Sequence, residues 1–213
     1  MTTFIIVRHG FSIYNKERRF TGQTDIPLDE IGVLQAQRNA EYVLANYKID
    51  RIYSSDLDRA YKTALPVAQA LGLPIIKSDQ LRELYLGVWE GQRIEDIKRN
   101  QPEAFAHYKR TAPDACGLGG ETKGQLRERV SREFERIAAE NEGKTVFVAA
   151  HGGTIRYLCS AWMNIPIERI REVPNILNAS LTIVDFEPTT GKAAFRLISY
   201  NKHLGELADV TTL

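Results

Sequence analysis

Two short apolar runs in this sequence each end in a histidine followed by glycine. Residues 3–7 lead into Arg8-His9-Gly10, and residues 144–150 lead into His151-Gly152-Gly153. Runs of this length that are rich in β-branched residues and stop at a glycine predict buried strands of a sheet. In open α/β sheets, ligands bind beyond the carboxyl ends of the strands. The repetition therefore predicts a ligand site that contains both histidines.

A long polar stretch follows the first predicted strand. Residues 11–28 contain a glycine and many charged and amide side chains, which indicates a loop. Long ordered loops at strand ends usually carry function, so we expect this one to wrap around the ligand site. Asp29 then predicts the N-cap of a helix. Apolar residues recur after it at helical spacing and predict its buried face: Val33, Ala36, Ala40, Val43, Leu44 and Tyr47.

A second predicted strand, at residues 51–54, leads towards another arginine. Residues 55–58 predict a capped helix start, and Arg59 falls in the first turn of that helix. In a parallel sheet this arginine faces the same crevice as Arg8, and a guanidinium group binds phosphate or carboxylate through a planar fork of donors. Glu83 lies farther along, in a stretch rich in leucine. Apolar neighbours favour the neutral form of its carboxyl group, whereas the arginines favour the ionised form.

The remaining segments complete the sheet and add a cap. Residues 73–77 predict a third strand, and residues 92–121 predict two short helices and a glycine-rich loop that cover the ligand site as a small helical cap. A long helix is expected from Thr122 onward. The last two predicted strands, at residues 181–186 and 194–199, are separated by a Pro-Thr-Thr-Gly turn. So short a connection predicts a hairpin and therefore an antiparallel strand at one edge of the sheet.

Length and composition predict one domain, residues 1–213. The formal net charge of +1 argues against nucleic acid or a membrane surface as a partner recognised by bulk charge. No stretch approaches the ~20 apolar residues of a membrane span and no signal peptide is evident, so a cytoplasmic location is expected. The chain lacks the ligand spacing of a zinc site. Cys116 and Cys159 are expected to be free thiols, His107 and His203 to lie at the surface, and the last residues to form a mobile tail.

The candidate residues suit one type of reaction, the transfer of a phosphoryl group to a histidine. Arg8 and Arg59 would hold the phosphate oxygens and the charge that develops on them. One imidazole would attack phosphorus through a neutral nitrogen, with its other ring nitrogen donating to a carbonyl or carboxylate, while the second histidine stabilises the transferred group. Gly152 would add a backbone amide at a helix start. A protonated Glu83 would give its proton to the leaving oxygen and later deprotonate the attacking water.

Several short motifs occur in order along the chain. They are Arg8-His9-Gly10 with Ser12 and Asn15, then Phe20-Thr21-Gly22, Ser54-Ser55-Asp56-Leu57-Asp58-Arg59-Ala60 through Thr63-Ala64, Leu81-Arg82-Glu83, Gly87-Val88-Trp89-Glu90-Gly91 and His151-Gly152-Gly153. Together these motifs resemble those of the histidine phosphatase superfamily, also called phosphoglycerate mutase-like. The resemblance runs from the N-terminus to about residue 185.

The resemblance implies an α/β fold, a three-layer α/β/α sandwich around a mostly parallel central sheet. It also implies a phosphohistidine intermediate on His9, a phosphate pocket of Arg8, Arg59 and His151, and Glu83 as the proton donor. By the same resemblance, four further residues match positions that line the phosphate or the substrate: Asn15, Thr21, Gly22 and Gly152.

The expected function is that of a phosphomonoester hydrolase that uses no metal or other cofactor. Its expected partner is a small-molecule phosphate ester, and a homodimer is left open. A phosphoglycerate mutase of the same superfamily is the alternative. The span from Gly91 to Gly120 is shorter than in such mutases, however, and residues 21–28 and 151–156 resemble the phosphatase branch. A phosphate-ester sensor without catalysis is less favoured, because candidates for nucleophile and acid are both present.

Overall fold

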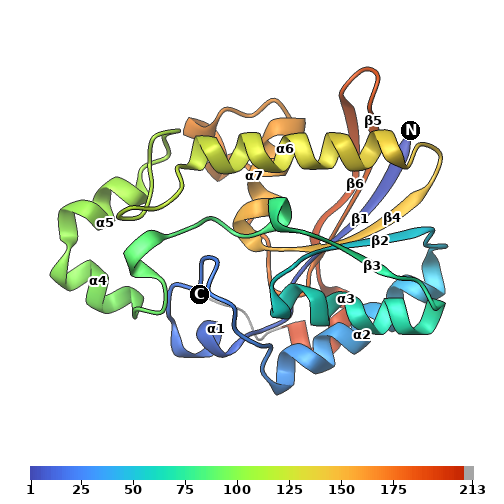
Figure 1. Ribbon diagram of the computed structural model, residues 1–213, viewed down its shortest axis with the longest axis horizontal. Coiled ribbons are helices and arrows are strands. Elements are labelled where there is room, and N and C mark those ends of the chain that lie inside the picture. The colour runs from blue at the N-terminus through green and yellow to red at the C-terminus, as the bar shows by residue number, and fades with distance from the viewer. Residues whose placement is uncertain (209–213) are drawn as a thin grey trace.

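Six strands form a single sheet in the computed structural model, which describes residues 1–208. Their order across the sheet is β3-β2-β4-β1-β5-β6 (Figure 1). The strands are β1 (Thr2–Arg8), β2 (Arg51–Ser55), β3 (Ile75–Ser78), β4 (Thr145–Ala150), β5 (Leu181–Glu187) and β6 (Lys192–Tyr200).

The sheet is mostly parallel, as expected. Strands β3, β2, β4 and β1 pair in parallel, whereas β5 runs antiparallel to both β1 and β6. The predicted antiparallel edge is therefore present, and the strand of opposite direction is β5, one position in from the edge strand β6. In the register of β1 with β4, Arg8 lies opposite Ala150. The residues that follow, His9 and His151, consequently leave the sheet side by side.

Helices cover both faces of the sheet (Figure 1). On β1, Phe4 and Ile6 pack in the apolar cluster that includes α6 and α7, whereas Ile5 and Val7 pack in the cluster that includes α2 and α3. This alternation along one strand makes the three layers. The helices are α1 (Ile13–Glu17), α2 (Glu30–Asn46), α3 (Asp58–Leu71), α4 (Ile94–Asn100), α5 (Pro102–Lys109), α6 (Lys123–Glu140) and α7 (Gly152–Trp162).

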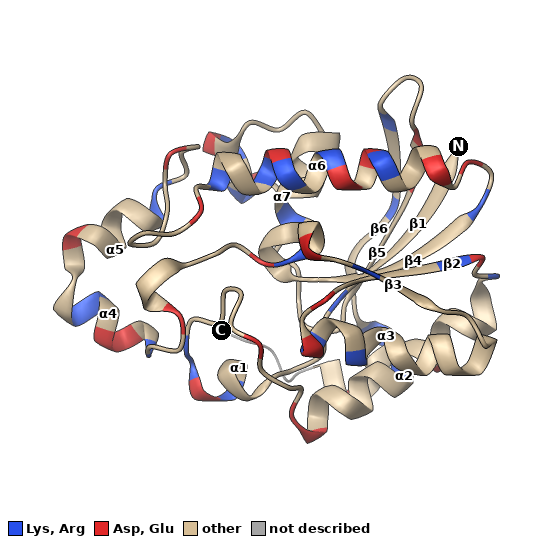
Figure 2. Ribbon diagram, in the orientation of Figure 1, with Lys and Arg blue, Asp and Glu red and all other residues tan. Residues whose placement is uncertain are grey.

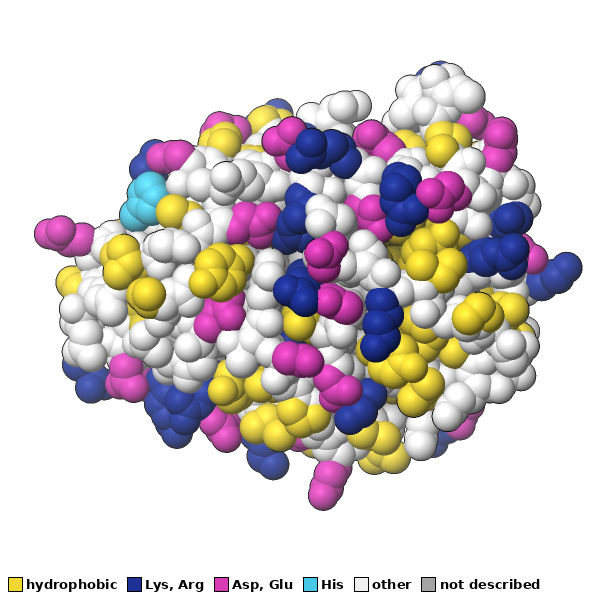
Figure 3. Space-filling model, in the orientation of Figure 1, with side chains coloured by type: hydrophobic (Ala, Val, Ile, Leu, Met, Phe, Trp, Pro, Cys, Tyr) yellow, Lys and Arg dark blue, Asp and Glu magenta, His cyan; other side chains and the backbone are white. Residues whose placement is uncertain are grey.

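The long helix α6 illustrates how local sequence fixes an element. The Thr122 hydroxyl accepts from the backbone N–H of Gln125, and the Gln125 side chain accepts from the backbone N–H of Thr122, which forms a capping box. Its outer face carries alternating acidic and basic side chains (Figure 2). On the molecular face in Figure 3, side chains of both signs are likewise interspersed. The opposite side of α6 is buried in the core through Leu126, Val130, Phe134, Ile137 and Ala138.

Helices α4 and α5 lie beside the carboxyl ends of the parallel strands, away from the main layers (Figure 1). Aromatic contacts attach them to the loop after β1. Phe20 from that loop stacks on Trp89 at a centroid distance of 5.9 Å, and Tyr108 of α5 packs edge-on against both rings. The segment predicted as a cap therefore forms one wall beside the strand ends.

Several local predictions are wrong in detail. Val33 is 45% exposed, because the buried face of α2 is turned towards Ala36, Ala40 and Val43. No side chain within residues 55–58 caps α3. Instead, the backbone N–H of Asp58 donates to the carboxylate of Asp25, from the loop after β1.

The two remaining histidines differ from each other. His107 lies on α5 and is partly exposed, whereas the His203 ring is half-buried against α2, where its Nε2 donates to the Asn39 side chain. The predicted mobile tail falls on residues 209–213, outside the described residues. Within residues 1–208, no helix combines the length and apolar character needed to cross a membrane.

Candidate active site

His9 and His151 face each other at the carboxyl ends of β1 and β4. Their ring centroids are 5.2 Å apart with an interplanar angle of 60°. His9 is 4% exposed and His151 is fully buried. The backbone N–H of His9 also donates to the carbonyl of Ala150 at 2.9 Å, so the ladder between the two strands continues into the site.

A backbone carbonyl fixes the tautomer of His9. Its Nδ1 lies 2.7 Å from the carbonyl oxygen of Gly10. A carbonyl can only accept, so Nδ1 carries the proton and Nε2 keeps its lone pair. Burial, followed by the charges of Arg59 and Arg8, holds the pKa of His9 well below its usual range. The ring is therefore neutral at neutral pH and presents a nucleophilic nitrogen.

Arg59 is the largest charged side chain buried in the site. Its Nη1 donates to the carbonyl of Thr24 at 2.9 Å, and its Nη2 donates to the carbonyl of Gly22 at 2.7 Å. Burial lowers its pKa to about 10, although the charge of Glu83 opposes this effect, so the guanidinium group stays charged at neutral pH. The Nε of Arg59 is buried and finds no hydrogen-bond partner within residues 1–208.

A threonine connects Arg59 to the nucleophile segment. The Thr63 hydroxyl donates to the Arg59 carbonyl at 2.7 Å, one turn earlier in α3, and accepts from the backbone N–H of Gly10 at 3.0 Å. Gly10 itself passes so close to α2 that a Cβ there would lie 2.5 Å from the carbonyl oxygen of Gly32. Thr63 was part of a sequence motif, but its position between two site residues was not predicted.

Arg8 reaches the site from the last position of β1. Its Nη1 donates to the carbonyl of Ile176 at 2.6 Å, and burial lowers its pKa to about 10. The side chain runs past the start of α7, where a Cβ on Gly152 would lie 3.2 Å from Arg8 Nε. Gly152 therefore permits the close approach of this arginine to the helix N-terminus.

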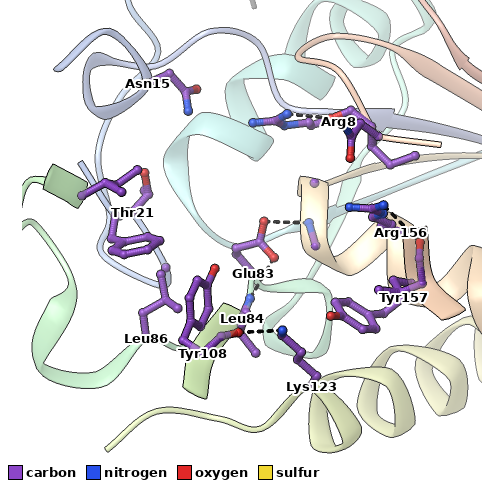
Figure 4. Close-up of a pocket in the computed structure, with 18 of the residues that line it drawn as sticks. Arg8, Asn15, Thr21, Glu83, Leu84, Leu86, Tyr108, Lys123, Arg156 and Tyr157 are labelled. Atoms are coloured by element: carbon purple, nitrogen blue, oxygen red, sulfur yellow. Dashed lines mark hydrogen bonds between the residues drawn. The ribbon is translucent and has the colours of Figure 1, made fainter. Parts of the chain in front are cut away.

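The surroundings of Glu83 differ from the sequence-based expectation. Its carboxylate accepts three backbone N–H groups, from Leu84 at 2.9 Å (drawn in Figure 4), Gly153 at 3.0 Å and Thr154 at 3.2 Å. Two of these donors belong to the first turn of α7, where the helix dipole also favours negative charge. The carboxylate is therefore bound by backbone N–H groups, although Leu84 and Leu86 line the same cavity.

Glu90 organises the loop after β1 and was missed as a site residue. It accepts from the backbone N–H of Gln23 at 2.8 Å, the hydroxyl of Thr24 at 2.8 Å and the backbone N–H of Leu86 at 3.1 Å. At Gly22, where φ is +51°, a Cβ would lie 2.0 Å from Glu90 Oε1. Gly22 thus packs on Glu90 and directs its carbonyl to Arg59.

The side-chain oxygen of Asn15 is engaged in hydrogen bonds within the protein. Asn15 Oδ1 accepts from the backbone N–H of Ser12 and from the Asn178 side chain, both at 3.1 Å. Its amide nitrogen is therefore the group that can donate to a ligand. Asn15 and Thr21 both line the cavity (Figure 4).

A cavity of about 570 Å³ opens over these groups. The predicted residues that line it are Arg8, His9, Asn15, Thr21, Gly22, Arg59, Glu83 and Gly152. His151 is fully buried against His9 and is not among the lining residues, and both of its ring nitrogens lack a hydrogen-bond partner in the described part of the chain. Sequence reasoning missed the lining residues contributed by the cap and by the two helices α6 and α7, among them Tyr108, Lys123, Arg156 and Tyr157.

The sequence matches the model of the histidine phosphatase superfamily (branch 1) over residues 4–198. The chain belongs to this superfamily. It is 36% identical to phosphoglycerate mutase-like protein 4 of Arabidopsis thaliana, with 84% of this chain and 77% of the relative covered. It is 30% identical to phosphoserine phosphatase 1 of Hydrogenobacter thermophilus, with 97% and 96% covered. Among solved structures, Bacillus stearothermophilus YhfR superposes with a TM-score of 0.88 at 30% identity, covering 96% of this chain and all of that one.

Proposed function

We propose that this protein hydrolyses small phosphomonoesters, without a metal ion, through a phosphohistidine intermediate on His9. One observation carries the proposal. The His9 ring is neutral, with its Nδ1 bonded to the carbonyl of Gly10, and the charges of two guanidinium groups, those of Arg8 and Arg59, act on it. A neutral nucleophile beside fixed positive charges suits attack on a phosphate dianion, because the arginines hold the equatorial oxygens and the developing charge.

In the first step, His9 Nε2 attacks phosphorus in line, and the bond between phosphorus and the ester oxygen breaks. The Glu83 carboxyl gives its proton to the departing oxygen, which leaves as an alcohol. In the second step, the Glu83 carboxylate takes a proton from water, whose oxygen attacks phosphorus and breaks the bond to His9. Inorganic phosphate leaves and Glu83 is protonated again, so the cycle is balanced.

The backbone contacts of Glu83 suit its role as a base. The N–H groups of Gly153 and Thr154 donate to the carboxylate that takes a proton from water in the second step. His151, whose ring faces that of His9 and whose ring nitrogens have no hydrogen-bond partner among the described residues, is the proposed donor to the phosphoryl group once that group is on His9.

A phosphoglycerate mutase is the second candidate, because one relative at 36% identity is named as mutase-like. A mutase would use the same phosphohistidine but return the phosphoryl group to another hydroxyl instead of water. The test is to supply a phosphoglycerate together with a bisphosphoglycerate as primer. Isomerisation that is faster than phosphate release would favour a mutase over a hydrolase.

The test is phosphate release from a panel of phosphomonoesters in the presence of EDTA, with His9→Ala as the matched variant. We expect release by the wild type that EDTA leaves unchanged and that falls to background in His9→Ala. Binding of phosphate esters with no release and no isomerisation would instead support a sensor and would contradict the proposal.

A further inference from the structure

Arg129, on α6, binds the backbone of the segment that carries Glu83. Its Nη1 donates to the carbonyls of Gln80 at 2.6 Å and Arg82 at 3.1 Å, and its Nη2 donates to the carbonyl of Glu83 at 3.4 Å. Arg129 is not among the residues that line the cavity. It therefore contacts the proposed acid from outside the site, while the start of α7 binds the acid's carboxylate.

Glu121, at the end of the cap segment, extends this contact to the other side of Glu83. Arg129 Nε and Nη2 donate to the two carboxylate oxygens of Glu121 at 2.8 Å and 2.9 Å. The Glu121 backbone N–H donates to the carbonyl of Tyr85 at 2.9 Å, and the Tyr85 backbone N–H donates to Glu121 Oε2 at 3.4 Å. The ion pair thus binds backbone groups from residue 80 to residue 85.

The ion pair is shielded from water. The side chains of Arg129 and Glu121 are 14% and 15% exposed. In each other ion pair formed within residues 1–208, at least one partner is more than twice as exposed. A guanidinium group has five N–H groups in a rigid plane, and those of Arg129 have five acceptors, two on Glu121 and three on the backbone. Such a group fixes its partners relative to one another.

Two other elements bind the same stretch of backbone. The Gln23 side chain, from the loop after β1, donates to the Glu83 carbonyl at 3.0 Å. The Thr154 hydroxyl, in the first turn of α7, donates to the Arg82 carbonyl at 2.9 Å. Arg129 therefore holds this backbone against two elements that also contribute to the candidate site. A general acid must lie within hydrogen-bond reach of the leaving oxygen, so a small displacement of this backbone would slow proton transfer.

We propose that Arg129, together with Glu121, is a positioning residue for the Glu83 carboxyl group. It holds the backbone on both sides of Glu83 and thereby fixes where the proton donor meets the leaving oxygen. The inference rests on the proposed hydrolase function, in which Glu83 gives this proton. Since Arg129 does not line the cavity, it acts through Glu83 and not on the phosphate.

Two substrates distinguish this role from a general structural one. Glycerol 3-phosphate needs a proton on its leaving oxygen, whereas p-nitrophenyl phosphate does not. The leaving-group ratio is kcat on the first ester divided by kcat on the second. Arg129→Met removes the five donors and keeps a long unbranched side chain. We expect it to lower the leaving-group ratio about tenfold or more. KM for both esters should change little, because Arg8 and Arg59 remain to bind the phosphate.

A second ion pair on α6 provides the matched control. Arg136 donates to Glu133 at 2.8 Å and 2.9 Å and also to Glu140, so its partners lie outside residues 80–85. Arg136→Met breaks a comparable pair on the same helix and should keep the wild-type leaving-group ratio. In the Glu83→Gln background, Arg129→Met should lower the ratio little further, because both substitutions act on proton donation by residue 83. An unchanged ratio in Arg129→Met, or fully additive losses in the double variant, would overturn the inference.

Arg129→Lys covers the case in which Arg129→Met does not fold. It keeps a positive charge beside Glu121 but has three protons in place of five, so it cannot bind the carboxylate and all three carbonyls. We expect its leaving-group ratio to fall about threefold or more, and an unchanged ratio would overturn the inference. A ratio unchanged in Glu83→Gln would instead count against the proposed function, in which Glu83 is the acid, so the two failures are distinguishable.

Discussion

Glu83 and Gly153 are joined at the start of α7 so closely that no side chain fits between them. The Gly153 N–H donates to Glu83 Oε2 at 3.0 Å, and a Cβ on Gly153 would lie 2.4 Å from Glu83 Oε1. Gly153 therefore donates a hydrogen bond to the Glu83 carboxylate, the proposed acid, and its lack of a side chain leaves the space that this carboxylate occupies.

Gly153→Ala should displace the Glu83 carboxylate without unfolding the protein, because the clash is with the end of a flexible side chain. We expect kcat for alkyl phosphates to fall about tenfold or more. In the Glu83→Gln background, Gly153→Ala should lower kcat little further, because both substitutions act on the same carboxyl group. Steady-state kinetics of the two single variants and the double variant measure this coupling. Fully additive losses of kcat in the double variant would show that Gly153 does not act through the Glu83 carboxylate.

Glu83→Gln removes the proton donor and keeps the shape of the side chain. We expect kcat for esters with poor leaving groups, such as glycerol phosphate, to fall about 100-fold or more. An activated ester such as p-nitrophenyl phosphate should lose far less, because its phenolate leaves without a proton. The comparison of kcat on both substrates decides the matter, and equal slowing would remove Glu83 as general acid.

Arg59→Lys keeps a positive charge but loses the fork that donates to the carbonyls of Gly22 and Thr24. The ammonium group cannot hold this loop and bind a phosphate at the same time. We expect kcat/KM to fall about 100-fold or more. Arg38→Lys, at an exposed position on α2, is the matched control. A rate near that of the wild type would place Arg59 outside the phosphate site.

Stability should fall with acidification between about pH 6.5 and 5. The pKa values of His9 and His151 are well below 6.5 in the folded protein, mainly through burial, so in this range the unfolded chain binds more protons. The free energy of unfolding therefore decreases as pH falls, by up to about 1.4 kcal/mol per pH unit for each histidine. Urea unfolding at several pH values measures the slope.

The control for this slope is His151→Asn, which removes one titrating ring and should flatten it. His203, whose pKa is lowered to about 4 by burial, remains in both proteins and contributes equally. A slope that does not change in His151→Asn would show that this histidine is not buried in its neutral form.

Local patterns were sufficient to predict the sheet and the residues at its strand ends. The apolar run before Arg8 and the run before His151 are buried strands, and their parallel register alone brings His9 and His151 together. The position of these residues in the fold follows from their position in the sequence, because a residue directly after a buried strand lies at the end of that strand.

Contacts between distant segments were not predictable in this way. Glu83 was expected among apolar groups because it lies in a stretch rich in leucine, yet its carboxylate accepts from the N-terminus of α7, about 70 residues away. Glu90 stood in a sequence motif but was given no role, and Lys123 was not singled out, since their positions depend on how the loop after β1 and the cap fold back. The cavity lining contributed by the cap, α6 and α7 was missed for the same reason.

The most direct test of the account is to identify the residue that carries phosphate during turnover. The enzyme is mixed with a phosphomonoester, quenched in alkali within the first turnover, and digested, and the phosphopeptide is mapped by mass spectrometry. We expect an acid-labile phosphate on His9 that is absent from His9→Ala. Phosphate on another residue, or trapping that survives His9→Ala, would contradict a phosphohistidine intermediate on His9.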